Sequence, residues 1–250
     1  MKIDEDVYLV GSGQIRLSNP MDSNVYLIDG GEKTVLVDSG VGIDTDTILR
    51  NIQKDGFNPE SIAFLLLTHS HADHSGGAKW IKTKTGCRVM ASELEAHIIQ
   101  EGSERELGLD VAKRSRIYPK DYQFHHCEID GILRDNDMLD IGNYKIKVIL
   151  IGGHSPSSAC FLLEGKGLHR LFSGDTVFFG GTIGLGNWFG SSLEAYRRDI
   201  VKLKGLGIDA LFPGHYIWTL KGGQEFLDRA IENLQQAWVP PAWRHMHPLL

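Results

Sequence analysis

The sequence is poor in cysteine and has no apolar run long enough to span a membrane. Its 250 residues include only Cys87, Cys127 and Cys160, none of them in a C-x-x-C pair. An odd number of unpaired cysteines predicts buried thiols in a cytoplasmic protein rather than a disulfide framework. The acidic start, Met1 to Asp6, lacks the basic and apolar regions of a signal peptide. No stretch approaches the ~20 apolar residues of a membrane-spanning helix, so we expect no membrane association.

Clustered positive charge is also missing. The formal net charge is −6, and lysine and arginine are scattered without forming a basic stripe. Nucleic-acid binding needs clustered cations against the phosphates, so we expect no nucleic-acid partner. Repeats and low-complexity segments are absent, and 42% of the residues are hydrophobic. Residues 1–250 are therefore expected to form one domain around a sizeable core.

What the sequence does contain is a dense group of ligand-type side chains at residues 68–77, THSHADHSGG. The apolar run 62–67 before it predicts a buried strand, so the group lies on a tight loop at a strand end. Its ligand-type residues are His69, His71, Asp73 and His74. Neutral imidazoles and ionised carboxylates this close together are typical of a divalent metal site.

Three more apolar strands end in a ligand-type residue, namely His154, Asp175 and His215. Strand ends at one rim of a sheet bring residues together that are distant in sequence. The collected set of five histidines and two aspartates suits two divalent ions, each with room for water. Nitrogen and oxygen ligands without cysteine favour zinc, with iron or manganese as alternatives.

The remaining pattern alternates strands and helices and predicts an α/β fold. Strands are expected at 7–10, 24–29, 34–38, 87–91, 122–129, 137–151 (a hairpin), 159–164, 168–172 and 210–212. Ser92 and Glu95 have the spacing of a capping box and predict the start of a helix. Residues 102–121 are polar with scattered apolar positions, and we expect an inserted helical segment that covers the site as a lid.

The order of these motifs resembles the metallo-β-lactamase superfamily. His-x-His-x-Asp-His is followed by Gly-His, Gly-Asp and Pro-Gly-His, and the resemblance runs from about Val7 to His215. It implies a four-layer αβ/βα sandwich with two metals at one edge. By resemblance, the first metal would be held by His69, His71 and His154, the second by Asp73, His74 and His215. Asp175 would bridge the two metals, and Asp38 would orient the ligands.

The resemblance also implies a chemistry. A hydroxide shared by two metals would attack a carbonyl carbon, and Asp73 would accept a proton. True β-lactamases of this fold place cysteine or serine where Asp175 stands, whereas the aspartate resembles the glyoxalase II, lactonase and ribonuclease Z groups. The expected reaction is hydrolysis of an ester, thioester or lactone of a small molecule. A β-lactamase, or an iron enzyme of redox or sulfur chemistry resembling the persulfide dioxygenases, are the alternatives.

Substrate contacts are suggested at two aromatic positions. Trp188 lies in a glycine-rich loop after Asp175, where it could form an apolar wall or simply anchor the loop. Tyr216 follows His215 and could polarise a carbonyl or pack in the core. Trp238 and Trp243 flank Pro240-Pro241 and suggest a subunit contact, which would make the protein a homodimer.

Overall fold

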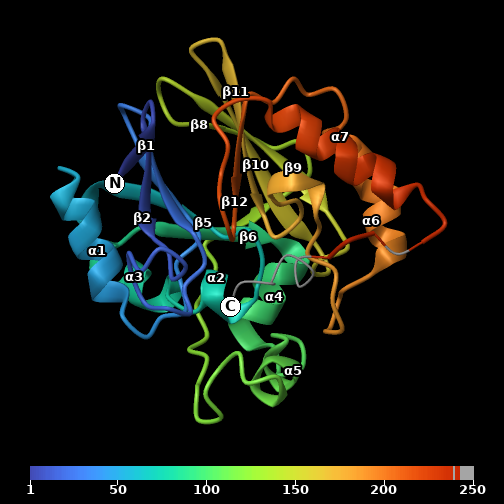
Figure 1. Cartoon of the computed structure of the whole chain (residues 1–250). Coiled ribbons are helices and arrows are strands. Elements are labelled where there is room, and N and C mark those ends of the chain that lie inside the picture. Colours follow the sequence, from blue (N-terminus) through green and yellow to red (C-terminus); the bar gives the residue numbers. More distant parts are fainter. Residues whose placement is uncertain (239, 243–250) are drawn as a thin grey trace.

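Two β-sheets packed face to face, with helices on both outer faces, form the structure (Figure 1). This computed structural model describes residues 1–238 and 240–242. Trp243 therefore lies outside the described residues, and Trp238 is exposed. The expected homodimer stays a prediction.

The first sheet has seven strands in sequence order. They are β1 (Lys2–Asp4), β2 (Val7–Gly11), β3 (Val25–Asp29), β4 (Thr34–Val37), β5 (Ile62–Leu66), β6 (Arg88–Ser92) and β7 (Gly131–Leu133). Strands β1 to β4 pair antiparallel, whereas β4 to β7 pair parallel. Parallel neighbours need long crossover connections, and helices supply most of them on the outer face.

The second sheet has five strands in the order β12-β11-β10-β9-β8. They are β8 (Met138–Asp140), β9 (Lys145–Ile151), β10 (Ser158–Gly165), β11 (Leu168–Gly174) and β12 (Ala210–Pro213). Strands β8 to β11 are antiparallel neighbours, and β12 runs parallel to β11. Strands β9, β11 and β12 consequently point the same way and end at the same edge of the sheet.

Short helices cover the sheets. They are α1 (Thr45–Lys54), α2 (Ala72–Ser75), α3 (Ala78–Thr85), α4 (Glu93–Glu101), α5 (Leu109–Arg114), α6 (Leu193–Asp199) and α7 (Gly223–Leu234), with 3-10 turns η1 (Pro59–Ser61), η2 (Phe179–Gly181) and η3 (Ile200–Leu203). The sequence explains their limits: Asp44 caps α1 by accepting from the Thr47 amide, and Ser192 caps α6 by accepting from the Ala195 amide. None of the helices in the described part of the chain combines the length and the apolar character that crossing a bilayer needs.

Three hydrophobic clusters define the four layers. Between the sheets, Tyr26 packs on Phe172, and Phe172 stacks on Phe212 at 5.0 Å between ring centroids. A second cluster joins the outer face of the first sheet to α1, α3 and α4. A third joins the outer face of the second sheet to α6 and α7. The predicted four-layer αβ/βα sandwich is confirmed.

Two local predictions are wrong. Residues 122–129 form no strand; they run along α4, where the Cys127 amide and the His126 ring contact the carbonyl of Ile99. Tyr122 is held by its hydroxyl on the Val41 carbonyl rather than by a strand neighbour. A helix does begin after Ser92, as predicted, but Glu95 makes no capping box, because its buried carboxylate faces the site loops instead.

Candidate metal centre

Every predicted ligand follows the carboxyl end of a strand. His69 comes after β5, His154 after β9, Asp175 after β11 and His215 after β12, and Asp38 directly follows β4. Because the strands concerned run the same way within their own sheets, these ends meet at one rim of the sandwich. The structure brings all seven ligand-type side chains together there, in overlapping groups of three.

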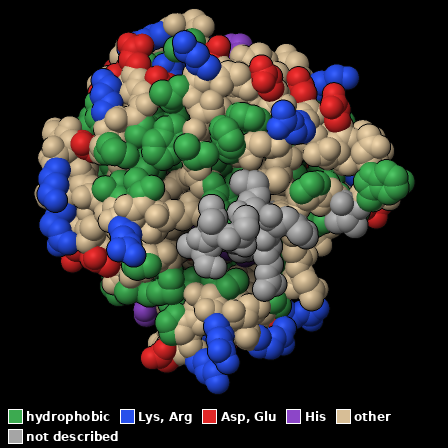
Figure 2. Space-filling view, viewed as in Figure 1, with side chains coloured by type: hydrophobic (Ala, Val, Ile, Leu, Met, Phe, Trp, Pro, Cys, Tyr) green, Lys and Arg blue, Asp and Glu red, His purple; other side chains and the backbone are tan. Residues whose placement is uncertain are grey.

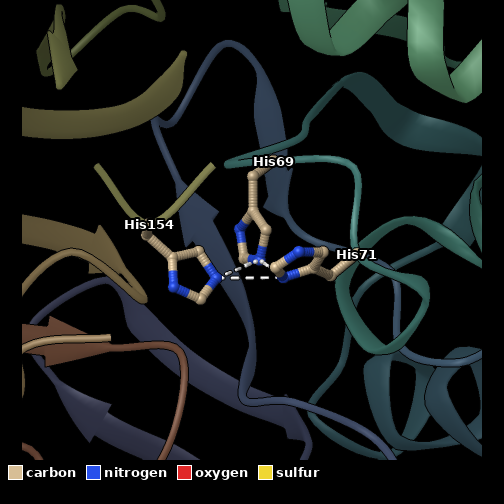
Figure 3. A group of neighbouring side chains, drawn as sticks. All are labelled: His69, His71 and His154. Carbon is tan, nitrogen blue, oxygen red and sulfur yellow. Dashed lines mark hydrogen bonds between the residues drawn. The ribbon is translucent and has the colours of Figure 1, made fainter. Parts of the chain in front are cut away.

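Three histidines form the first group (Figure 3). The Nε2 of His154 lies 3.1 Å from the Nε2 of His69 and 3.0 Å from the Nδ1 of His71, and the latter two atoms are 3.1 Å apart. Each nitrogen of a neutral imidazole is either a donor or an acceptor, so the three contacts among these atoms cannot all be hydrogen bonds. A tetrahedral zinc site needs ligand nitrogens about 3.3 Å apart, so the group fits a cation.

The outer nitrogens of two of these rings, His69 and His154, are held by fixed partners. His69 Nδ1 lies 3.0 Å from Thr68 Oγ1, and His154 Nδ1 donates to the Gly184 carbonyl at 2.6 Å. Such contacts aim the opposite nitrogen inward, as in known metal sites. Position 184 needs glycine because a Cβ there would lie 2.4 Å from His154 Nδ1. The glycine-rich loop contains no sequence signal that would predict this contact.

The second group combines histidines and carboxylates. His215 Nε2 lies 3.0 Å from Asp73 Oδ2, 3.3 Å from His74 Nε2 and 3.4 Å from Asp175 Oδ2. The same Asp175 oxygen lies 3.6 Å from His154 Nε2 in the first group. Asp175 therefore stands between the two groups, where a bridging carboxylate would be.

Asp38 fixes the second group from behind. Its buried carboxylate accepts from His74 Nδ1 at 2.8 Å and from the Thr68 amide at 2.8 Å. The first contact sets the tautomer of His74 and points its Nε2 at the group. The backbone of Asp38 is left-handed (φ 62°), a conformation that aspartate tolerates better than most residues. This geometry is the one expected of an orienting residue.

Electrostatics differ between the two groups. Burial lowers the pKa of His71 and of His154 to about 4, so both rings are neutral at pH 7, as metal ligands must be. Burial also lowers the pKa of His215, but Asp175 and Asp73 outweigh it and raise that pKa to about 9. In the second group, a proton on His215 therefore balances part of the charge of the carboxylates, which a bound cation would balance instead.

The two suggested substrate residues lie beside the groups. The ring of half-buried Trp188 is 5.5 Å from that of His71, and its indole N–H donates to the His154 carbonyl at 2.7 Å. Tyr216 is also half-buried, with its ring 6.4 Å from that of His215. Burial and Asp175 raise the pKa of Tyr216 to about 12. Trp188 therefore borders the first ligand group, and Tyr216 borders the second.

Two further residues support the site and were not predicted to do so. Glu95 on α4 accepts from the Ser70 amide, the Ser155 hydroxyl and the Ser157 amide at 2.6 to 2.9 Å. Tyr118, from the inserted segment, donates its hydroxyl to Asp73 Oδ1 at 2.8 Å. Neither contact has a local sequence signal, because each joins parts of the chain that only the fold brings together.

Comparison with known proteins identifies relatives. A family model described as the metallo-beta-lactamase superfamily matches residues 18–215. The atrochrysone carboxyl ACP thioesterase of Aspergillus fumigatus is 25% identical over 90% of this chain and 55% of its own length. The hydroxyacylglutathione hydrolase of Chromohalobacter salexigens is 28% identical over 78% of this chain and 62% of its own length. This chain thus spans little more than half of these two relatives.

Other matches extend the comparison. Acyl-coenzyme A thioesterase MBLAC2 of Homo sapiens is 27% identical over 78% of this chain and 73% of its own length. Among solved structures, a B3 metallo-beta-lactamase with an active-site glutamic acid matches with a TM-score of 0.70 at 21% identity, covering 91% of this chain and 85% of its own. FEZ-1 from Legionella gormanii also gives 0.70, at 19% identity, covering 92% and 91%. At such identities the structural likeness shows the fold.

Proposed function

This chain belongs to the metallo-β-lactamase superfamily, and we propose that it is a dinuclear, metal-dependent hydrolase that cleaves the thioester of a small acyl group. The observation that carries the proposal is the meeting of five histidines and two aspartates at one rim, in two groups that share Asp175. Three relatives named as thioesterases or as a hydroxyacylglutathione hydrolase favour a thioester over an ester or a lactone.

The residues would divide the work as follows. His69, His71 and His154 would hold one ion, and Asp73, His74 and His215 the other, with Asp175 shared between them. Zinc suits this nitrogen and oxygen set best. When bound, a pair of such ions supplies a deprotonated water as nucleophile and polarises the carbonyl oxygen.

Protein groups would complete the reaction. Asp73 would accept the proton of the attacking water at its carboxylate, and Asp38 would keep His74 in the tautomer that leaves Nε2 free. The indole of Trp188, nearly perpendicular to the ring of His71, would limit the access of bulk water to the reacting carbonyl. Tyr216, held on the other side near His215, would contact the acyl group.

The side chains of the inserted segment favour a thioester substrate whose thiol part is anionic. An open pocket of about 450 Å³ is lined by Met21, Lys113, Arg116, Ile117, Tyr118, Pro119 and Lys120. Figure 2 shows lysine and arginine side chains gathered around the segment at the lower edge of the molecule. Arg116 and Lys120 are exposed and form no ion pair within the described part of the chain. Because Tyr118 borders both this pocket and Asp73, the pocket adjoins the reacting centre.

The test is a reconstitution assay. Metal-free protein is loaded with zinc, manganese or ferrous iron and offered acyl thioesters of coenzyme A, of glutathione and of N-acetylcysteamine, with a lactone and a β-lactam beside them. The proposal predicts release of thiol that depends on zinc and disappears on chelation. Hydrolysis of the β-lactam alone, or oxygen consumption with iron and no thioester hydrolysis, would contradict it.

A further inference from the structure

We propose that Tyr118 is a positioning residue for the second ligand group, which fixes the carboxylate of Asp73 with one defined oxygen facing His215. The inference rests on the proposed metal sites. It assigns a role in the metal centre to the inserted segment 102–121, which the motif pattern alone would leave as a surface cover.

The two oxygens of Asp73 have separate partners. Oδ1 accepts the Tyr118 hydroxyl at 2.8 Å, while Oδ2 faces His215 Nε2 at 3.0 Å and His74 Nε2 at 3.7 Å. A phenol has an ordinary pKa near 10, so at neutral pH its hydroxyl is a donor to the carboxylate. The contact engages a lone pair of Oδ1 and leaves Oδ2 for a metal.

The backbone of Asp73 is fixed independently of Tyr118. Its carbonyl oxygen accepts the hydroxyl of Ser23 at 2.8 Å and the amide of Ser23 at 3.2 Å. Since these bonds hold the main chain but not the carboxylate, the rotation of the carboxylate about its own bond is left to contacts of the two oxygens. Tyr118 is the partner that holds the oxygen on the side away from the histidines.

Tyr118 can act in this way because its own ring is immobilised. The ring is 7% exposed and stacks on Tyr122 at 5.2 Å between centroids, with 24° between the planes. The Tyr122 hydroxyl in turn donates to the Val41 carbonyl at 2.9 Å. Both tyrosines belong to one buried cluster with Ala72, the residue before Asp73, and with Leu107 and Leu109 of the inserted segment.

This stacked pair offers a matched control. Tyr118 and Tyr122 have similar burial and share one cluster, but only the hydroxyl of Tyr118 touches a ligand-type residue. Tyr118→Phe and Tyr122→Phe each remove one buried hydroxyl. Their effects on stability should be similar, and their effects on the second metal should differ.

The experiment measures the affinity of metal-free protein for zinc by competition with a chromophoric chelator. Partners that orient a ligand contribute about 10- to 100-fold to metal affinity. We expect Tyr118→Phe to lower the affinity for the second zinc equivalent by at least about 10-fold and to leave the affinity for the first unchanged. Tyr122→Phe should leave both equivalents unchanged, and Tyr118→Gln, which retains a donor, should recover part of the loss.

Three results would overturn the inference. The first is a Tyr118→Phe variant whose affinity is unchanged for both zinc equivalents. The second is a Tyr118→Phe variant that binds both equivalents equally more weakly, and the third is a Tyr122→Phe variant with the same effect as Tyr118→Phe. If Tyr118→Phe does not fold without metal, the rate of zinc release from the loaded variant into excess chelator gives the same comparison. A wild-type protein that binds at most one zinc would contradict the dinuclear proposal itself, whereas two equivalents with an unaffected Tyr118→Phe would remove only the role of Tyr118.

Discussion

Removing the carboxylate of Glu95 should destabilise the protein more than any surface substitution. Glu95 has no exposed surface, and it accepts three hydrogen bonds from two separate loops. One loop carries Ser70 between the first two histidines, and the other carries Ser155 directly after His154. Glu95 therefore ties together the two loops that form the first ligand group.

The magnitude follows from the donors that are left without a partner. Glu95→Ala leaves the amides of Ser70 and Ser157 without their partner, at about 1–3 kcal/mol each, whereas the Ser155 hydroxyl keeps a second contact with the Ser158 hydroxyl at 2.6 Å. Because such losses overlap, we expect about 4 kcal/mol in the free energy of unfolding. Glu95→Gln keeps the size of the side chain but places an amide N–H, itself a donor, against one of the donors that the carboxylate accepted from, which should cost about 2 kcal/mol.

Urea unfolding of the metal-free protein measures this directly, because it separates folding from metal affinity. Glu93→Gln, on the exposed side of the same helix, is the matched control and should lose less than about 1 kcal/mol. A loss below about 1 kcal/mol for Glu95→Ala would refute the reasoning, since it would mean that the unpaired donors find water or new partners.

Three further predictions follow. The double variant Arg116→Gln/Lys120→Gln should raise KM at least about threefold for thioesters of coenzyme A or glutathione, but should leave KM unchanged for thioesters of N-acetylcysteamine. Arg114→Gln, whose charge is paired with Asp110 outside the pocket, should leave KM unchanged for all of these substrates. Asp175 and Asp73 raise the pKa of His215 to about 9, so its ring is protonated at pH 7.5, and binding of the second zinc should release at least about one proton, seen by calorimetry in buffers of different ionisation enthalpy. An exchange that stays near zero would contradict this. Burial raises the pKa of all three thiols, so a disulfide reagent at pH 8 should label none in the native protein and all three in denaturant.

The sequence was sufficient to predict the parts of the site that strands position. When a ligand directly follows an apolar strand, as His154 does, the few residues before it predict both the strand and the position of the ligand at the rim of the sheet. The four layers could be predicted for the same reason, because each strand or helix shows its own hydrophobic pattern and the motif order resembles one family.

The missed features depend on contacts between distant segments. Glu95 has the spacing of a capping residue, but burial against Ser155 outweighs that local preference. Residues 122–129 run along α4, where Cys127 and His126 contact the carbonyl of Ile99, a residue distant from them in sequence. Tyr118 lies in a polar segment whose sequence does not indicate that its hydroxyl reaches Asp73.

The central claim is that two metal ions bind in the two groups that share Asp175. Anomalous diffraction at the zinc edge, on crystals of the zinc-loaded protein, locates the ions without reference to activity. The account predicts two peaks, one among His69, His71 and His154 and the other among Asp73, His74 and His215, with Asp175 contacting both. A single peak, or a second peak away from these residues, would contradict it.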